Sequence, residues 1–193
     1  IAPDEPEVWF CLGTMRLRQG IEAEGLADLK TALRLQPDML PALKNAAAVS
    51  YRLGHLTDAE KYYCRVMELA PYDGDSLAAL AAIAARRLKP GEARRLAERA
   101  LALQRDSFTA EMAIGRADLT DGLPERARER MERLLGRADL SDDNRIAVLD
   151  LRAEALDAIG LTDAAFADYR SRNAILRQKF TPLMERESAE RRV

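Results

Sequence analysis

The chain has 193 residues, of which 48% are hydrophobic but only 5% aromatic, and its charged side chains nearly cancel to a formal net charge of −2. The apolar fraction is too high for a disordered tail, and the near-neutral charge argues against nucleic acid, whose partners are usually strongly basic. The sequence contains no run of about 20 apolar residues that would span a bilayer, and its start, Ile-Ala-Pro-Asp-Glu-Pro, is not a signal peptide.

The apolar residues are mainly alanine and leucine, which favours helices over strands. No segment alternates apolar and polar residues as a half-buried strand would, so we expect an all-α fold. Cys11 and Cys64 both lie within apolar helical patterns, and we expect two buried, reduced thiols rather than a disulfide. Reduced thiols predict a cytoplasmic protein. Because the first residue is not Met, we expect the chain to be part of a longer protein.

The sequence repeats itself with a period of about 34 residues, a spacing found in helical repeat proteins. We expect four consecutive units of two helices at about residues 4–37, 38–71, 72–105 and 106–139. Series of residues at this spacing define the repeat: Gly25, Ala59, Ala93 and Ala127; Gly20, Gly54, Leu88 and Gly122; Trp9, Leu43 and Leu77; Leu29, Tyr63, Ala97 and Met131; Ala32, Val66, Ala100 and Leu134; Pro37 and Pro71.

Each series predicts a local structural role. The glycines at positions 20, 54 and 122 separate two amphipathic stretches, where the backbone leaves one helix and enters the next. The small residues at 25, 59, 93 and 127 allow the two helices to approach, and a leucine there would cost about 1–3 kcal/mol. Pro37 and Pro71 end second helices because proline lacks an amide hydrogen. Pro90 and Pro124 suit the first turn of a second helix.

A fifth unit is expected at about residues 142–179. Gly160 and Ala165 keep the five-residue spacing of Gly54 and Ala59, but they come four residues late. We place the extra residues in the polar segment 136–145.

The last residues, 181–193, are mostly charged. Thr181 is a suitable N-cap for a helix whose first turn contains Pro182. This segment is therefore expected to be either a C-terminal helix that caps the fold or a linker to a further part of the protein.

These positions resemble the tetratricopeptide repeat (TPR), whose pattern places Trp, Leu-Gly, Tyr, Ala, Phe, Ala and Pro at set places. The first unit matches it with Trp9, Leu12-Gly13, Gly25, Leu29, Ala32 and Pro37, although Arg16 stands where Tyr is usual. The second unit matches it with Leu43, Ala46-Ala47, Ala59, Tyr63, Val66 and Pro71. The resemblance covers about residues 4–179. It implies a single domain over residues 1–193, an α-α superhelix (solenoid) of five helical hairpins plus a C-terminal helix.

The sequence predicts no catalytic centre, metal or cofactor. His55 is the only histidine and falls in a turn. No pair of Cys or His residues has metal-ligand spacing, and no glycine-rich loop follows a strand. We therefore expect a chain that binds partners and is not itself an enzyme.

In the TPR family the first helices line a concave groove that carries the ligand, and this resemblance implies a protein or peptide partner. The residues expected in the groove are Phe10, Thr14, Arg18, Lys44, Tyr51, Arg52, Arg86, Met112 and Arg116. Arg18, Arg52 and Arg86 are each one repeat period apart and should form a basic ladder that suits an acidic segment or a free carboxylate. The alternative is that these arginines only complement the dipoles of the helices that they end. Neither nucleic acid nor a membrane is expected as a partner, and a homodimer through the terminal units remains open.

A second resemblance concerns residues 165–177. Phe166, Asn173-Ala174 and Arg177 are similar to the helix that precedes the catalytic domain in bacterial proteins joining TPRs to a sulfotransferase. This resemblance implies a repeat region that holds a substrate or self-associates, with the catalytic domain outside the chain. The donor-binding strand, loop and helix of a sulfotransferase are absent from the 193 residues.

Overall fold

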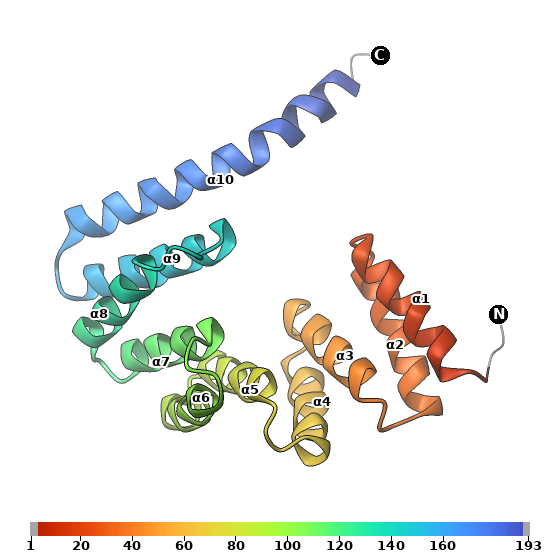
Figure 1. Cartoon of the computed structure of the whole chain (residues 1–193). Helices are drawn as coiled ribbons and strands as arrows, with labels where there is room; N and C mark the ends of the chain where they lie inside the picture. Colours follow the sequence, from red (N-terminus) through yellow and green to blue (C-terminus); the bar gives the residue numbers. More distant parts are fainter. Residues whose placement is uncertain (1–3, 191–193) are drawn as a thin grey trace. The chain divides into compact units, whose positions relative to one another are not determined.

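The computed structural model describes residues 4–190, with side chains described through residue 181. Ten α-helices and no strand occur in this range, so the predicted all-α class is confirmed. No helix within it is long and apolar enough to cross a membrane. The helices are α1 (Pro6–Arg18), α2 (Glu22–Leu35), α3 (Leu40–Arg52), α4 (Leu56–Leu69), α5 (Gly74–Arg86), α6 (Pro90–Leu103), α7 (Phe108–Thr120), α8 (Pro124–Leu135), α9 (Asp142–Ala158) and α10 (Thr162–Glu190) (Figure 1).

The helix boundaries reproduce the period of the sequence. Helices α1, α3, α5 and α7 begin at residues 6, 40, 74 and 108, and helices α2, α4, α6 and α8 begin at residues 22, 56, 90 and 124. Each step equals the repeat period, so one period corresponds to one pair of helices. Helices α2 and α4 end two residues before Pro37 and Pro71, and Pro90 and Pro124 open α6 and α8, as predicted.

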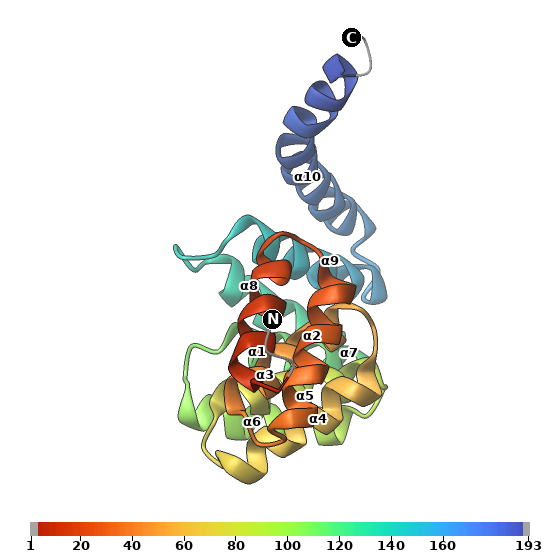
Figure 2. The same cartoon turned by 90° about the vertical axis from the view of Figure 1, so that its right-hand side faces the viewer.

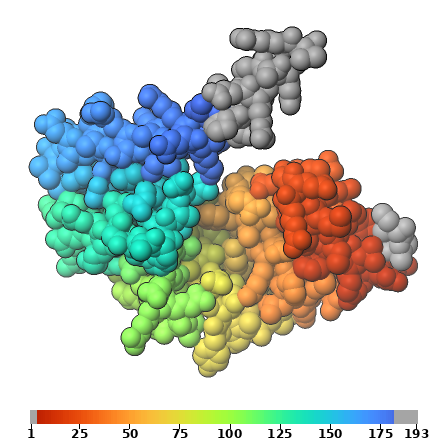
Figure 3. Space-filling view, turned by 45° about the horizontal axis from the view of Figure 1, so that its top comes forward, coloured from red at the N-terminus to blue at the C-terminus, as the bar shows by residue number. Residues whose placement is uncertain are grey.

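The chain divides into two compact units, residues 1–110 and residues 111–193. In the first unit, α1 pairs with α2, α3 with α4, and α5 with α6 (Figures 1 and 2). The colours of this unit run in order from red to yellow in Figure 3, so each hairpin lies beside the hairpin that follows it in the sequence. Its first two hairpins share a core formed by Leu26, Leu29, Leu33, Ala42, Leu43, Ala46, Val49 and Val66.

The turn inside each hairpin has a left-handed residue at the same place. Gly20, Gly54, Gly122 and Gly160 have φ values of 78°, 80°, 71° and 79°, which confirms the predicted role of the glycine series. Leu88 takes this place in the third hairpin with φ 56°. A side chain is strained in this conformation, whereas glycine is not.

The small residues lie where the two helices of a hairpin touch. A Cβ atom on Gly13 would be 2.9 Å from the carbonyl oxygen of Gly25, and one on Gly25 would be 2.7 Å from Leu17 Cδ2. The predicted close approach is therefore confirmed in the first hairpin. The equivalent residues of the next three hairpins are fully buried: Ala59, Ala93 and Ala127.

The four extra residues of the fifth hairpin form one more turn of helix. Helix α9 has 17 residues, whereas α7 has 13. The side chain of Ser141 caps α9 by accepting a hydrogen bond from the Asn144 amide, and the buried residues of α9 begin only at Val148. The insertion lies within the predicted segment 136–145, as the exposed first turn of α9.

Residues 181–190 belong to α10 and do not form a helix of their own. The Thr181 hydroxyl donates to the carbonyl oxygen of Arg177 at 2.7 Å, a contact typical of the interior of a helix. The prediction that Thr181 caps a new helix is wrong, because the backbone continues in helical geometry past it. Residues 191–193 of the predicted C-terminal segment lie outside the described residues.

The two cysteines are free, but both are exposed, so their predicted burial is wrong. Cys11 lies on the outer side of α1, beside Val8 and Leu12. Cys64 lies at the edge of the apolar stripe of α4, where partial burial and the carboxylate of Glu60 raise the pKa of its thiol. Helical periodicity identifies an apolar face, but it does not say whether another helix covers that face.

Candidate functional site

The residues predicted to line a groove all belong to first helices. Seven of them lie on α1, α3 and α5 of the first unit: Phe10, Thr14, Arg18, Lys44, Tyr51, Arg52 and Arg86. The other two, Met112 and Arg116, lie on α7 in the second unit.

Tyr51 and Arg86 form the best-defined contact of this set. The Arg86 guanidinium carbon lies 5.0 Å from the centroid of the Tyr51 ring, and Arg86 Nη1 donates to the Tyr51 carbonyl oxygen at 3.3 Å. A cation over an exposed aromatic ring contributes about 0.5–1 kcal/mol. Arg86 is thereby held against α3 while it stays exposed. The sequence suggested a role for each residue but not that they meet, because they are 35 residues apart.

Lys44 is partly neutralised by a carboxylate. Its ammonium group donates to Asp73, which also caps α5 by accepting from the Ser76 amide at 3.0 Å. Burial by itself would raise the pKa of Asp73, but the hydrogen bonds from Lys44 and Ser76 lower that pKa below its usual value. Lys44 therefore links α3 to the start of α5 and keeps less free charge than the sequence suggested.

The other residues of α1 and α3 are also engaged within the unit. Arg52 Nε donates to Glu22 Oε1 of α2 at 2.7 Å. The Thr14 hydroxyl donates to the Phe10 carbonyl oxygen at 2.8 Å and accepts a bond from Asn45 Nδ2 at 3.4 Å. Phe10 is half-buried against the core of the first two hairpins, so only part of its ring faces outward.

The three arginines that stand one repeat period apart have different surroundings. Arg52 pairs with Glu22, and Arg86 stacks on Tyr51. Arg18 is exposed. Within the described part of the chain, no carboxylate pairs with Arg18 or Arg86, so these two hold the uncompensated positive charge of the predicted set in the first unit.

In the second unit, one of the two predicted groove residues contacts an acidic residue of α9. Arg116 donates to Glu154, and Met112 is half-buried. Asp150, another acidic residue of α9, accepts from Arg172 of α10 at 2.7 Å. Glu154 and Asp150 of α9 therefore pair with arginines of their own unit.

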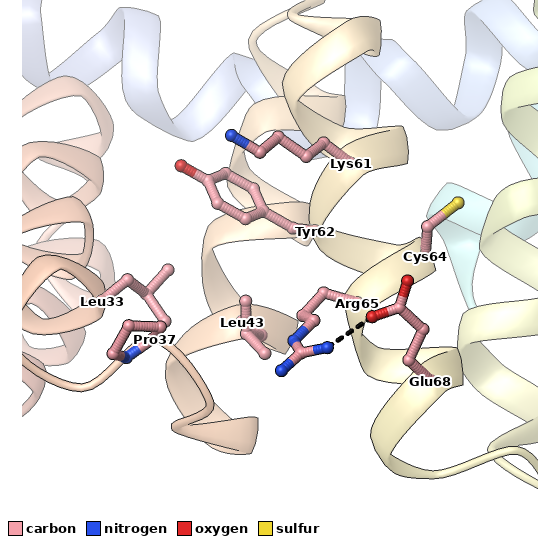
Figure 4. Close-up of a pocket in the computed structure, with 8 residues that line it drawn as sticks. All are labelled: Leu33, Pro37, Leu43, Lys61, Tyr62, Cys64, Arg65 and Glu68. Atoms are coloured by element: carbon pink, nitrogen blue, oxygen red, sulfur yellow. Dashed lines mark hydrogen bonds and ion pairs between the residues drawn. The ribbon is translucent and has the colours of Figure 1, made fainter.

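A cavity of about 470 Å³ in the first unit did not emerge from the sequence. Its apolar residues come from α2, the turn after it and α3, whereas α4 supplies an aromatic and polar rim (Figure 4). In Figure 4 the Tyr62 ring and the Lys61 side chain extend from α4 above Leu33 and Leu43, and Arg65 pairs with Glu68. Partial burial raises the pKa of the Tyr62 hydroxyl. The lining residues are Leu33, Pro37, Leu43, Lys61, Tyr62, Cys64, Arg65 and Glu68.

The cavity suits an apolar side chain of a partner, with a polar residue next to it in the partner's sequence that reaches the polar rim. No sequence signal pointed to this cavity, because its residues belong to three helices and to no single repeated series.

Among the described residues, no group of three or more His, Cys, Asp or Glu side chains could hold a metal ion. His55 lies exposed in the predicted turn, at the N-cap of α4.

Comparisons of the sequence with known proteins give one partial match. No protein-family model matches the chain. The Protein CTR9 homolog of Arabidopsis thaliana is 31% identical over 118 residues, a match that covers 60% of this chain but only 11% of that protein.

Solved structures match over much more of the chain. A tetratricopeptide repeat protein from Parabacteroides merdae has a TM-score of 0.74 at 19% identity, covering 88% of this chain and 65% of the other. The TPR protein TTC0263 from Thermus thermophilus has a TM-score of 0.71 at 17% identity, and the match covers 95% of this chain and 98% of TTC0263. MamA from Desulfovibrio magneticus has a TM-score of 0.69 at 16% identity, and the match covers 91% of this chain and 97% of the MamA chain.

Proposed function

Because the chain has the tetratricopeptide-repeat fold, we propose that it is a protein-interaction scaffold without catalytic activity. The proposed ligand is an extended peptide, or an extended segment of a partner protein, lying along the first helices α1, α3 and α5 of the first unit. The observation that carries this proposal is the exposed Arg86 guanidinium held over Tyr51.

The proposed ligand carries acidic side chains or a free carboxylate. Arg86 and Arg18 supply positive charge that no carboxylate pairs with in the described residues. Guanidinium groups bind carboxylates with two parallel hydrogen bonds, and Arg86 is already oriented by Tyr51.

Charge alone does not hold such a ligand tightly. Exposed ion pairs contribute about 0–1 kcal/mol each, so apolar contacts with Phe10 and Tyr51 must add to them. Phe10 is half-buried, which limits the area that it offers. The proposed interaction is therefore weak and sensitive to salt.

The test is a charge reversal with a matched control. Arg86→Glu removes the proposed contact, whereas Arg99→Glu makes the same change on an exposed position of α6, away from the first helices. Fluorescein-labelled peptides of Glu, Ala and Leu, with free or amidated carboxyl ends, are titrated by anisotropy. Arg86→Glu is expected to weaken binding about tenfold, the effect of about 1.4 kcal/mol, and Arg99→Glu to leave it nearly unchanged. Equal affinities of the two variants at every salt concentration would refute the acidic-ligand proposal.

A second candidate function is that of an appendage of a larger bacterial sulfotransferase, holding its substrate or mediating self-association. The observation that favours it is that the matching residues of α10, Phe166, Asn173 and Arg177, are all exposed and available to another domain. The coding sequence after Val193 separates the two proposals. A strand leading into a basic, Ser/Thr-rich phosphate-binding loop would support the sulfotransferase proposal, and a stop codon would rule it out. A cytoplasmic location is part of both proposals.

A further inference from the structure

The outer face of α1 is apolar and partly exposed: Val8 and Leu12 are half-buried and Met15 is exposed. Val8, Leu12 and Met15 lie on it beside Cys11, around a shallow depression in the surface. Met15 is 58% exposed, although its side chain is apolar. A contiguous apolar face of this kind usually marks an interaction site.

The repeat shows what kind of element this face fits. Val8, Leu12 and Met15 are the third, seventh and tenth residues of α1. The same places in α3 hold Ala42, Ala46 and Val49, which are 0%, 0% and 1% exposed. In α3 these residues share a core cluster with Leu26, Leu29 and Leu33 of α2, the second helix of the preceding hairpin. The outer face of α1 therefore has the composition and register of a surface that receives a second helix.

The chain carries such a helix with an uncovered face of its own. Phe166 is the fifth residue of α10, the place that Leu26 occupies in α2. Leu26 is 4% exposed because it packs in the shared core, whereas Phe166 is 64% exposed. Phe180, 47% exposed, lies four turns further along the helix on the same side.

The start of α1 and the exposed side of α10 carry opposite charges. Asp4, Glu5 and Glu7 are exposed at the start of α1. Arg170 and Arg177 are exposed on α10, on the same side as Phe166. Where α2 packs against α3, the short connection between them places the start of α3 near the end of α2. The same pairing of α10 with α1 brings the acidic start of α1 toward Arg177 and brings Met15 toward Phe166.

We infer that the outer face of α1 in one copy of the chain binds the exposed face of α10 in a second copy. The contact is head to tail: it uses two different surfaces and continues the packing of one hairpin on the next across two molecules. A complex of two copies still presents one free α1 face and one free α10 face, so the association grows with concentration unless a ring closes.

The test is sedimentation equilibrium of the whole chain at several concentrations, with three variants. Met15→Glu blocks the α1 face and Phe166→Glu blocks the α10 face. Tyr72→Glu is the control, because Tyr72 is 84% exposed and lies on neither face. Circular dichroism checks that each variant keeps its helix content.

We expect the mean mass of the wild type and of Tyr72→Glu to rise with concentration. Each blocked variant should stay monomeric alone, because a carboxylate in the apolar contact weakens it by roughly 100-fold or more. An equimolar mixture of the two blocked variants should form a complex of two chains and grow no further, since one variant keeps its α10 face and the other its α1 face.

Three results would overturn the inference. The first is a constant monomer mass of the wild type. The α1 face would then bind another partner, such as a preceding repeat of a longer protein. The second is association that survives in both blocked variants. The third is a mixture that stays monomeric. A free wild-type monomer would leave the proposed peptide binding along α1, α3 and α5 untouched, so the two proposals fail separately.

Discussion

Helices α1 and α5 occupy the same place in their hairpins, yet their surroundings differ. Each has 13 residues and begins one unit of the repeat, but nine residues of α5 are buried and only Gly13 of α1 is. The tenth residue is Met15, 58% exposed, in α1 and Ile83, 1% exposed, in α5. Equivalent positions thus have similar chemistry but contribute differently to stability, because α4 of the preceding hairpin packs on α5, whereas no described helix precedes α1.

The largest expected effect compares the tenth residues. Ile83→Ala removes a fully buried side chain and is expected to lower the free energy of unfolding by about 2–5 kcal/mol. Met15→Ala, at the equivalent exposed position, should change it by about 0.5 kcal/mol or less. Urea unfolding at low protein concentration measures both. Similar losses in the two variants would mean that the outer face of α1 is covered within a single chain.

The second comparison concerns the eighth residue of the first helices, which is alanine (Ala81) in α5 but glycine in α1 (Gly13) and in α7 (Gly115). Gly13→Ala should destabilise by about 1–3 kcal/mol, because its Cβ would lie 2.9 Å from the backbone oxygen of Gly25. Gly115→Ala should cost less, since the nearest atom there is the flexible end of Met131. The control is Gly91→Ala, which meets nothing within 4 Å and should stabilise by about 0.5–1 kcal/mol. Thermal unfolding ranks the three variants, and a neutral Gly13→Ala would contradict the close packing of α1 on α2.

The third comparison concerns how the two helices begin. Asp73 caps α5 through the Ser76 amide, whereas Glu5 makes no side-chain cap on α1. Asp73→Ala should cost about 0.5–2 kcal/mol and Glu5→Ala almost nothing.

The Asp73 contribution should also depend on pH. Its folded-state pKa is lowered by Lys44 and Ser76, so the stabilisation is complete at neutral pH, above the ordinary carboxyl pKa. This stabilisation is lost as the pH falls below about 4 and through the lowered pKa of Asp73. The stability difference between the wild type and Asp73→Ala, measured from pH 7 to pH 3, should shrink. A difference that stays constant would count against the ionised cap.

The smallest effect is expected where the two helices end. Leu88 follows α5 with φ 56° and is 72% exposed, so Leu88→Gly relieves strain and loses little burial. We expect a gain of about 0.5–1 kcal/mol. At the same place after α1, Gly20 has φ 78°, and Gly20→Ala should cost about 1 kcal/mol. Chemical denaturation measures both variants. Stability changes of opposite sign would confirm that Leu88 and Gly20 occupy the same place in the turn, and a loss of stability in Leu88→Gly would contradict it.

Much of the fold could be predicted because the same types of residue recur at equivalent positions of successive repeats. The glycine series, the buried alanines and the prolines at helix ends depend on backbone geometry within one repeat, and the structure agrees with each of them. The location of the extra residues before the fifth hairpin was also predictable, since Gly160 and Ala165 keep the five-residue spacing of Gly54 and Ala59. That all five hairpins form one continuous domain remains a prediction.

The sites were harder to predict. Arg52 and Arg86 are equivalent in sequence, but one pairs with Glu22 and the other stacks on Tyr51, because each meets whichever side chains its neighbouring helix presents. The cysteines were expected to be buried and are exposed. Thr181 was expected to cap a helix and lies inside one. In each case the outcome depends on contacts beyond the local pattern.

The sequence by itself determined where helices begin, end and approach one another, since these features follow from φ angles, missing amide hydrogens and side-chain volume. Only the tertiary structure decided which apolar stripes become core, which arginines keep their charge free and where a cavity opens. Those outcomes depend on the number of neighbours around a helix, and that number is a property of the packed hairpins.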